Sequence, residues 1–218
     1  MKTAVIIPAA GAATRMGKQK QLMMLSGKPV IFHTIEAFEY HDDIDEIIVV
    51  AGGEVADAVE YYGFDKVTAI VDGKDSRQDS VRAGLAEVSA DTAFVLVHDG
   101  ARPLVSDRVI SDVLVRVKHG LCAIAGVKAK DTVKIADENG LVIDTPDREN
   151  AWLVQTPQGF PRHILEEAHQ KANFIGTDDA SLVERLGIPV CMVEGDYRNI
   201  KLTTPDDLRM AEVYIMGD

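Results

Sequence analysis

A glycine turn and several cations follow the first apolar run of the chain, in the stretch AVIIPAAGAATRMGKQKQL at residues 4–22. Three small residues come first: Ala9, Ala10 and Gly11. They allow the backbone to approach a ligand closely, and their amides can cradle an anion. Arg15 and Lys20 can then meet phosphate charge from two directions, as a planar fork and as a point charge. We therefore predict an anion site here; the alternative is a tight turn with solvated lysines.

Two familiar phosphate-binding patterns do not fit this stretch. A P-loop has four residues between its glycines and a Ser or Thr after its lysine. Here five residues separate Gly11 from Gly17, and Lys18 is followed by Gln19, which has no hydroxyl for magnesium. The dinucleotide fingerprint fails as well, because Gly11 is followed by two alanines instead of a second glycine. Neither pattern is present, and the missing dinucleotide fingerprint argues against the alternative of a nicotinamide-binding oxidoreductase.

Two later loops carry polar residues directly after predicted strands. The run at 66–71 leads into DGKDSRQDSVRAG, and the run at 93–97 leads into HDGARPL. Ligands of open α/β sheets bind beyond the carboxyl ends of the strands, so we expect these loops beside the first one. Asp99 and Arg102 are candidates for the site, although they also fit a purely structural ion pair. His98 is interpreted as a satisfied neighbour of the loop without a chemical role.

Length, composition and charge narrow the classes of protein. The chain has 218 residues, 46% of them hydrophobic, so residues 1–218 are predicted to form a single domain. A formal charge of −12 argues against nucleic-acid and membrane-surface partners, which attract basic patches. Cys122 and Cys191 lie in apolar runs and are interpreted as buried thiols. Neither a signal peptide nor a membrane-spanning run is recognised, and we expect a cytoplasmic protein.

The elements that must position these residues alternate along the chain. Apolar runs predict strands at 4–8, 46–52, 66–71, 93–99 and 122–127, and helical patterns predict helices at 29–41, 54–62, 80–88 and 106–119. This alternation predicts an α/β fold whose sheet is covered by helices on both faces. Further helices are predicted at 161–173 and 179–187, and short strands near 190–194 and 199–202. A capping residue, a proline and an acidic residue start a last helix: Thr204, Pro205 and Asp207.

The rhythm breaks at 131–148, where DTVKIADENGLVIDTPDR alternates with period two around an Asn-Gly dipeptide. That dipeptide is the strongest short-range signal for a hairpin. Because the segment is too polar to fill a core position, we predict a β-arm at about 130–150 that projects from the sheet. An added edge strand of the main sheet is the alternative.

Eight strings occur in order between Val5 and Tyr214: PAAGAATRMGKQKQ, VDGKDSRQDSV, VHDGARP, KDTVK, PDRENAW, QTPQGF, TDDAS and NIKLTTPDDL. In these strings the chain resembles the 2-C-methyl-D-erythritol 4-phosphate cytidylyltransferases of the non-mevalonate isoprenoid pathway. The resemblance implies a single-domain, three-layer Rossmann-like nucleotidyltransferase fold with a mostly parallel sheet. It implies transfer of a cytidylyl group from CTP to 2-C-methyl-D-erythritol 4-phosphate, release of pyrophosphate, and Mg²⁺ as the cofactor.

Carried over position by position, the resemblance implies roles for individual residues. It implies nucleotide contacts from Ala9, Ala10, Gly11, Lys74, Asp75, Ser80, Asp99 and Gly100. It implies catalytic roles for Arg15, Lys20, Arg148 and Lys201, and a metal ligand in Asp99. It implies contacts with the polyol phosphate from Arg102, Thr132, Thr156 and Thr177. The family commonly has glycine at the position of Lys74, which leaves a side-chain role there open.

Two further points follow from the resemblance, and two alternatives stay open. The family places a proline before its Lys-Gln pair; here Lys18-Gln19 and Lys20-Gln21 compete, and the distance to Leu22 favours Lys20. In the family, arm residues reach the neighbouring subunit's site, which implies a homodimer with arm-swapped sites. A ribitol-5-phosphate cytidylyltransferase is the nearest alternative, although HDGARP and TPDRENAW look more like the methylerythritol enzymes. A non-catalytic nucleotide-binding sensor is the more distant alternative.

Overall fold

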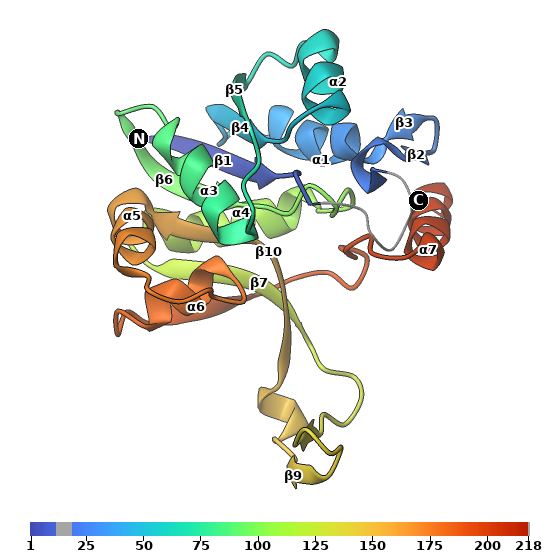
Figure 1. The fold of residues 1–218 in the computed structure, drawn as a ribbon, viewed down its shortest axis with the longest axis vertical. Helices are drawn as coiled ribbons and strands as arrows, with labels where there is room; N and C mark the ends of the chain where they lie inside the picture. The colour runs from blue at the N-terminus through green and yellow to red at the C-terminus, as the bar shows by residue number, and fades with distance from the viewer. Residues whose placement is uncertain (12–18, 218) are drawn as a thin grey trace.

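The centre of the protein is a seven-stranded sheet with the order β11-β7-β10-β6-β1-β4-β5 (Figure 1). The structure is a computed structural model that describes residues 1–11 and 19–217. The strands of the sheet are β1 (Lys2–Pro8), β4 (Glu46–Val50), β5 (Val67–Val71), β6 (Thr92–Val97), β7 (Cys122–Lys128), β10 (Trp152–Pro161) and β11 (Val190–Glu194). Only β10 runs antiparallel to its neighbours, β6 and β7. The predicted α/β fold with a mostly parallel sheet is confirmed.

Helices cover both faces of this sheet. On one face lie α1 (Val30–Glu39), α2 (Glu54–Tyr62) and α4 (Asp107–Lys118); on the other lie α3 (Arg77–Ala86), α5 (Arg162–Lys171) and α6 (Asp179–Glu184). Successive side chains of a strand point to opposite faces, so Val5 and Ile7 of β1 join one core cluster and Ile6 joins the other. The strands are therefore apolar on both sides, as continuous apolar runs require. Within the described ranges, no helix has the length and apolar character to cross a membrane.

The last helix, α7 (Pro205–Met216), lies against a small hairpin formed by β2 (Met24–Leu25) and β3 (Lys28–Pro29), as Figure 1 shows. Thr204 and Asp207 form a reciprocal capping box at its start, and Pro205 stands in its first turn, as predicted. Leu202 packs beside this helix in a small hydrophobic cluster that is separate from the two clusters of the sheet and also contains Leu25. This cluster anchors the segment before α7, which carries Lys201.

The predicted hairpin projects from the sheet as an arm and adds no strand to it (Figure 1). It comprises β8 (Ile135–Ala136), β9 (Val142–Asp144) and the 3₁₀ turn η2 (Arg148–Asn150). Gly140, at φ +81°, supplies the left-handed conformation of the turn. Apolar residues on the arm are exposed, among them Leu141 at 66% and Ile143 at 66%.

One strand was not predicted, and three sequence predictions differ from the structure. The strand β10 was not predicted, because its sequence contains Pro157 and Gly159, which are disfavoured in a central strand. Residues 199–202 form no strand. The helix predicted from Ser80 begins at Arg77, since Ser76 is its N-cap and accepts a hydrogen bond from the Asp79 amide. Both cysteines are free, but only Cys122 is buried; Cys191 is half-buried.

Candidate active site

A cavity of about 340 Å³ opens at the carboxyl edge of the sheet. Most of the predicted nucleotide and catalytic residues line it: Ala10, Gly11, Lys20, Lys74, Asp75, Ser80, Asp99, Gly100 and Lys201. They come from the ends of β1 and β6, the 3₁₀ turn η1 (Lys20–Leu22), the loop before α3 and the segment before α7. The cavity therefore lies at the edge of the sheet where the switch-point rule predicts a ligand site.

Small residues allow the loops around this cavity to touch. A Cβ atom added at Gly73 would lie 1.9 Å from the Cβ atom of Ala10, and one added at Gly100 would lie 2.9 Å from that of Ala9. Ala9 is itself only 3% exposed, and its amide donates to Val50 O at 2.8 Å. Ala9 thus holds the loop behind the cavity, and Ala10 and Gly11 face the space itself.

Polar contacts fix two further walls of the first cavity. The Lys74 amide donates to the hydroxyl of Ser80 at 3.0 Å, so the buried serine shapes the loop before α3. Gln21 Nε2 donates to Gly11 O at 3.4 Å, which links η1 to the glycine turn. The side chain of Lys74 is exposed at this cavity, and no carboxylate among the described residues pairs with its ammonium. Arg15 and Lys18 lie outside the described residues.

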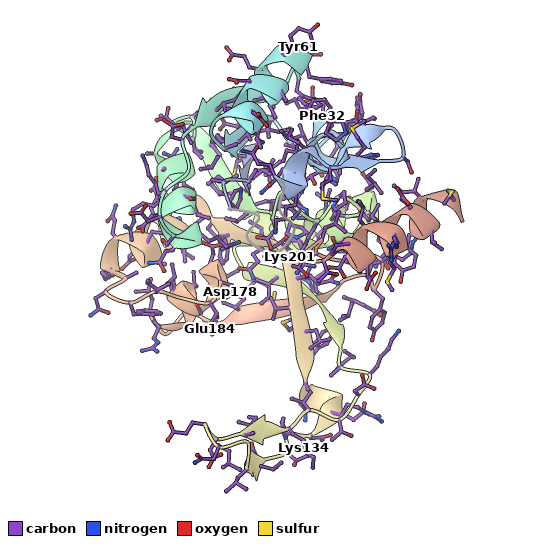
Figure 2. The ribbon with its side chains drawn as sticks, turned by 45° about the vertical axis from the view of Figure 1, so that its right-hand side comes forward. Phe32, Tyr61, Lys134, Asp178, Glu184 and Lys201 are labelled. Carbon is purple, nitrogen blue, oxygen red and sulfur yellow. The ribbon has the colours of Figure 1, made fainter. Side chains whose placement is uncertain are left out.

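A second cavity, of about 270 Å³, adjoins the first. Its lining includes Arg102, Thr156 and Thr177, three of the residues predicted to contact the polyol phosphate. Arg77, Asp99 and Lys201 line both cavities and form a charged wall between them. Figure 2 shows Lys201 and Asp178, both of which line the second cavity, in the body of the molecule.

Asp99 stands at the centre of the charged wall. Its Oδ1 accepts from Arg77 Nε at 3.0 Å, and its Oδ2 lies 2.8 Å from Lys201 Nζ. Burial opposes ionisation of this carboxyl, but Arg77 and Lys201 outweigh it and hold the pKa of Asp99 well below its usual range. Asp99 is therefore a carboxylate at neutral pH.

Arg77, which lines both cavities, was not among the predicted site residues. Its Nη1 donates to Asp179 Oδ2 at 2.7 Å, and His169 Nε2 lies 3.1 Å from the other oxygen of Asp179. Burial works against the charge of Arg77, but Asp179 and Asp99 together raise its pKa above the ordinary value. A signal was present: Ser76 and Asp79 have the spacing of a helix start, which places Arg77 in the first turn of α3.

Hydrogen bonds of His98 and Thr156 hold the loop after β6 in place. The Asp99 amide donates to Thr156 Oγ1 at 3.0 Å, and Thr156 Oγ1 lies 3.1 Å from His98 Nδ1. His98 Nε2 lies 3.1 Å from Arg102 O. Complete burial lowers the pKa of His98 to about 4, so the ring is neutral at pH 7. The interpretation of His98 as a satisfied neighbour of the loop agrees with this geometry.

The segment before α7 is bound to the same loop. Arg102 Nη1 donates to Asn199 O at 2.7 Å, and the Leu202 amide donates to Ala101 O at 2.8 Å. Asn199 Nδ2 donates in turn to Thr156 O at 2.8 Å. These bonds fix Asn199 and Leu202, on either side of Lys201, and so hold Lys201 at the charged wall.

Two predicted site residues lie apart from both cavities. Thr132 and Arg148 are exposed on the arm, and Arg148 Nη1 donates to Lys130 O at 3.3 Å. Figure 2 shows Lys134 of the arm well away from Lys201. A single copy of the chain therefore does not bring the arm residues to the cavities.

The donor set of the site suits phosphate better than a metal cage. In residues 1–11 and 19–217, no group of three or more His, Cys, Asp and Glu residues could hold a metal ion. Two carboxylates line the first cavity, Asp75 and Asp99, together with lysines and loop backbone. Mg²⁺ commonly takes one or two carboxylates and completes its shell with substrate phosphates and water, so these residues fit a phosphate-bound Mg²⁺.

Comparisons with known proteins agree with one another. The family described as 2-C-methyl-D-erythritol 4-phosphate cytidylyltransferase matches residues 3–217. The chain is 48% identical over 221 residues to the protein of that name from Alkaliphilus oremlandii (strain OhILAs), covering 97% of this chain and 94% of that one. A solved 4-diphosphocytidyl-2C-methyl-D-erythritol synthase from Anaerococcus prevotii superimposes with a TM-score of 0.89 at 30% identity, covering 99% of this chain and 96% of that one. The solved cytidylyltransferase from Thermus thermophilus gives a TM-score of 0.83 at 34% identity, covering 99% of this chain and 100% of that one.

Proposed function

Because the chain belongs to the family of 2-C-methyl-D-erythritol 4-phosphate cytidylyltransferases, we propose that its first cavity holds CTP and its second cavity the polyol phosphate. The enzyme transfers the cytidylyl group from CTP to 2-C-methyl-D-erythritol 4-phosphate and releases pyrophosphate. The observation that carries the assignment of the cavities is their shared wall of Arg77, Asp99 and Lys201. A transfer between two phosphates needs two adjoining sites with the reacting groups between them.

In this assignment the phosphate oxygen of the acceptor attacks the α-phosphorus of CTP. The new P–O bond forms as the bond to the β-phosphate oxygen breaks, and pyrophosphate leaves with the electron pair. A phosphate dianion is already nucleophilic near neutral pH, so the chain need not supply a nucleophile. Its task is to align two polyanions and cancel their charge. Lys20 and Arg15 stabilise the charge on the α-phosphate and the leaving pyrophosphate, and Lys201 stabilises the charge on the incoming phosphate.

Asp99 forms an ion pair with Lys201 and could also hold a metal ion. With Mg²⁺ bound, the ion supplies neutralisation of the phosphate charge. Asp99 would be the protein side chain that holds the ion on the shared wall. Lys201 Nζ, 2.8 Å from Asp99 Oδ2, stands at the second cavity and meets the charge of the acceptor phosphate there. Arg77 stays with Asp179, because that carboxylate is 1% exposed and needs a cation.

The composite nature of the site is part of the proposal. One domain, residues 1–218, carries an arm whose apolar residues are exposed and whose Arg148 lies away from both cavities of the same copy. A homodimer in which each arm completes the neighbour's second cavity accounts for both features. The expected location remains the cytoplasm, on the grounds of the sequence.

Steady-state kinetics test the two cavities separately. Ser80→Ala removes the hydroxyl that bonds the Lys74 backbone, and it should raise the KM for CTP about 10-fold while the KM for the polyol phosphate stays unchanged. Thr177→Val should do the reverse, because Thr177 lines only the second cavity. If both variants raise the same KM, the separation of the two substrates is wrong.

A thermal-shift panel tests the choice of nucleotide. CTP with Mg²⁺ should stabilise the protein, and NAD should not. Equal shifts with ATP and CTP would contradict a cytidine site.

A further inference from the structure

Three hydrogen bonds link Arg102 O, His98, Thr156 and the Asp99 amide, and their donors and acceptors can be assigned in only one consistent way. A backbone carbonyl only accepts, so His98 Nε2, next to Arg102 O, carries the ring proton. Nδ1 of the neutral ring is then an acceptor, and the hydroxyl of Thr156 donates to it. The Asp99 amide only donates, so the oxygen of Thr156 accepts from it. The hydroxyl proton of Thr156 is therefore committed to His98 and not available to a substrate phosphate.

This chain of bonds is closed off from solvent. His98 is 0% exposed and Thr156 is 4% exposed, so water does not compete for the bonds between them. The ring of His98 also lies against Phe38, with centroids 4.9 Å apart. The imidazole is thus held in place by packing and by both of its nitrogens. A side chain locked in this way can orient another.

The position of the Asp99 backbone matters because its carboxylate serves two cavities. The carboxylate must meet Arg77 on one oxygen and Lys201 on the other, at 3.0 and 2.8 Å. A shift of about 1 Å in such a group can cost about 10²-fold in rate. The Asp99 amide, one residue after His98, is the point where the loop is pinned to β10.

We propose that Thr156 and His98 are positioning residues for Asp99: His98 orients the hydroxyl of Thr156, and that hydroxyl holds the backbone which presents the Asp99 carboxylate to the reacting phosphates. This role differs from the direct contact with the polyol phosphate that the family resemblance implies for Thr156. The inference rests on the role given to Asp99 in the proposed function.

Two variants of Thr156 separate positioning from substrate contact. Thr156→Val keeps the shape but removes the acceptor for the Asp99 amide, and it should lower kcat about 10²-fold with little change in the KM for the polyol phosphate. Thr156→Ser restores the hydroxyl and should recover kcat to within about threefold. A Thr156→Val enzyme with normal kcat and a raised KM for the polyol phosphate would overturn the proposal.

Variants of His98 test the second link. His98→Leu removes both ring bonds at similar volume, and the double variant with Thr156→Val should lose no more kcat than Thr156→Val alone, since the two residues act as a unit. Losses that multiply would show independent roles and contradict the inference. Should His98→Leu fail to fold, the two Thr156 variants decide alone.

An Asp99→Asn variant in the same assay separates this inference from the proposed function. If Asp99→Asn keeps normal kcat, the role of Asp99 fails and the positioning argument with it. If Asp99→Asn is inactive and Thr156→Val is normal, only the positioning inference fails. Loss of activity in both, with recovery in Thr156→Ser, supports both.

Discussion

At the scale of residues, the site gathers cations that an acidic chain otherwise spreads over its surface. Lys20, Arg77 and Lys201 line one cavity in a protein of formal charge −12. The sequence predicted Lys20 and Lys201 as site residues because they lie in motifs that resemble those of the family. It did not predict Arg77, whose role depends on two carboxylates distant in sequence, Asp99 and Asp179. The helix-start spacing of Ser76 and Asp79 places Arg77 in α3, but its partners are brought to it by the tertiary fold and leave no local pattern.

The choice between the two lysine registers yields the first prediction. Lys20→Ala should fold normally and lose about 10²–10³-fold in kcat, because one preorganised cation at a reacting phosphate is removed. Lys18→Ala is the matched control and should lose little. Circular dichroism and steady-state turnover measure both variants. A fully active Lys20→Ala enzyme would refute both the register and the role.

The buried imidazole of His98 predicts a dependence of stability on pH. Its pKa is about 4 in the folded protein and about 6.5 in the unfolded chain, so below pH 6.5 the unfolded chain binds the proton first. The stabilisation is complete above pH 6.5 and is lost as pH falls through about 4. Urea unfolding at pH 7 and pH 4 should show a loss of about 3 kcal/mol in the wild type beyond that of His98→Asn. Equal losses in the two proteins would contradict a buried neutral ring.

At the scale of elements, the sequence predicted those whose pattern is local. Apolar runs indicated the buried strands β1, β4, β6 and β7, and the capping box indicated the start of α7. The strand β10 was missed because its sequence is unfavourable for a strand, and pairing with β6 and β7 stabilises it nonetheless. Its register shifts between Val154 and Gln158, which accommodates Pro157 at an irregular point of the ladder. Gln158 is fully buried there and bonds to Asp178, a partner that no local pattern reveals.

The ion pairs of Arg77 are predicted to hold three elements of the fold together. Arg77 joins α3 to the end of β6 and to α6 through Asp99 and Asp179. Arg77→Met should lower the free energy of unfolding by about 3–5 kcal/mol, because buried carboxylates lose their cation. Arg209→Met is the matched control; its pair with Asp206 is exposed and should contribute under about 1 kcal/mol. Denaturant unfolding compares the two, and equal losses would contradict the structural role of Arg77.

At the scale of the whole molecule, the arm is the feature that one copy of the chain does not explain. The arm projects from the sheet (Figure 1), and Thr132 and Arg148 line neither cavity of the same copy. The Asn-Gly pattern predicted the hairpin, and its polarity predicted that it would project. In the proposed homodimer, the place where the arm ends depends on a second copy, which no single-chain pattern specifies.

A complementation experiment tests the exchange of arms. Lys201→Ala and Arg148→Ala should each be nearly inactive, because each removes a cation from every site. In a mixed dimer, one site contains both intact residues if arms are swapped. Co-expressed variants should therefore recover about a quarter of wild-type activity, since half of the dimers are mixed and each has one intact site. No recovery in verified mixed dimers would place the arm at its own chain's site.

The central claim is that this enzyme joins CTP to 2-C-methyl-D-erythritol 4-phosphate at the wall shared by the two cavities. The most direct measurement is pyrophosphate release from CTP and Mg²⁺ with that acceptor, beside ribitol 5-phosphate and Lys201→Ala as controls. We expect release with the methylerythritol substrate and wild-type protein only. Release with ribitol 5-phosphate alone would keep the mechanism and contradict the substrate, and full release by Lys201→Ala would contradict the site.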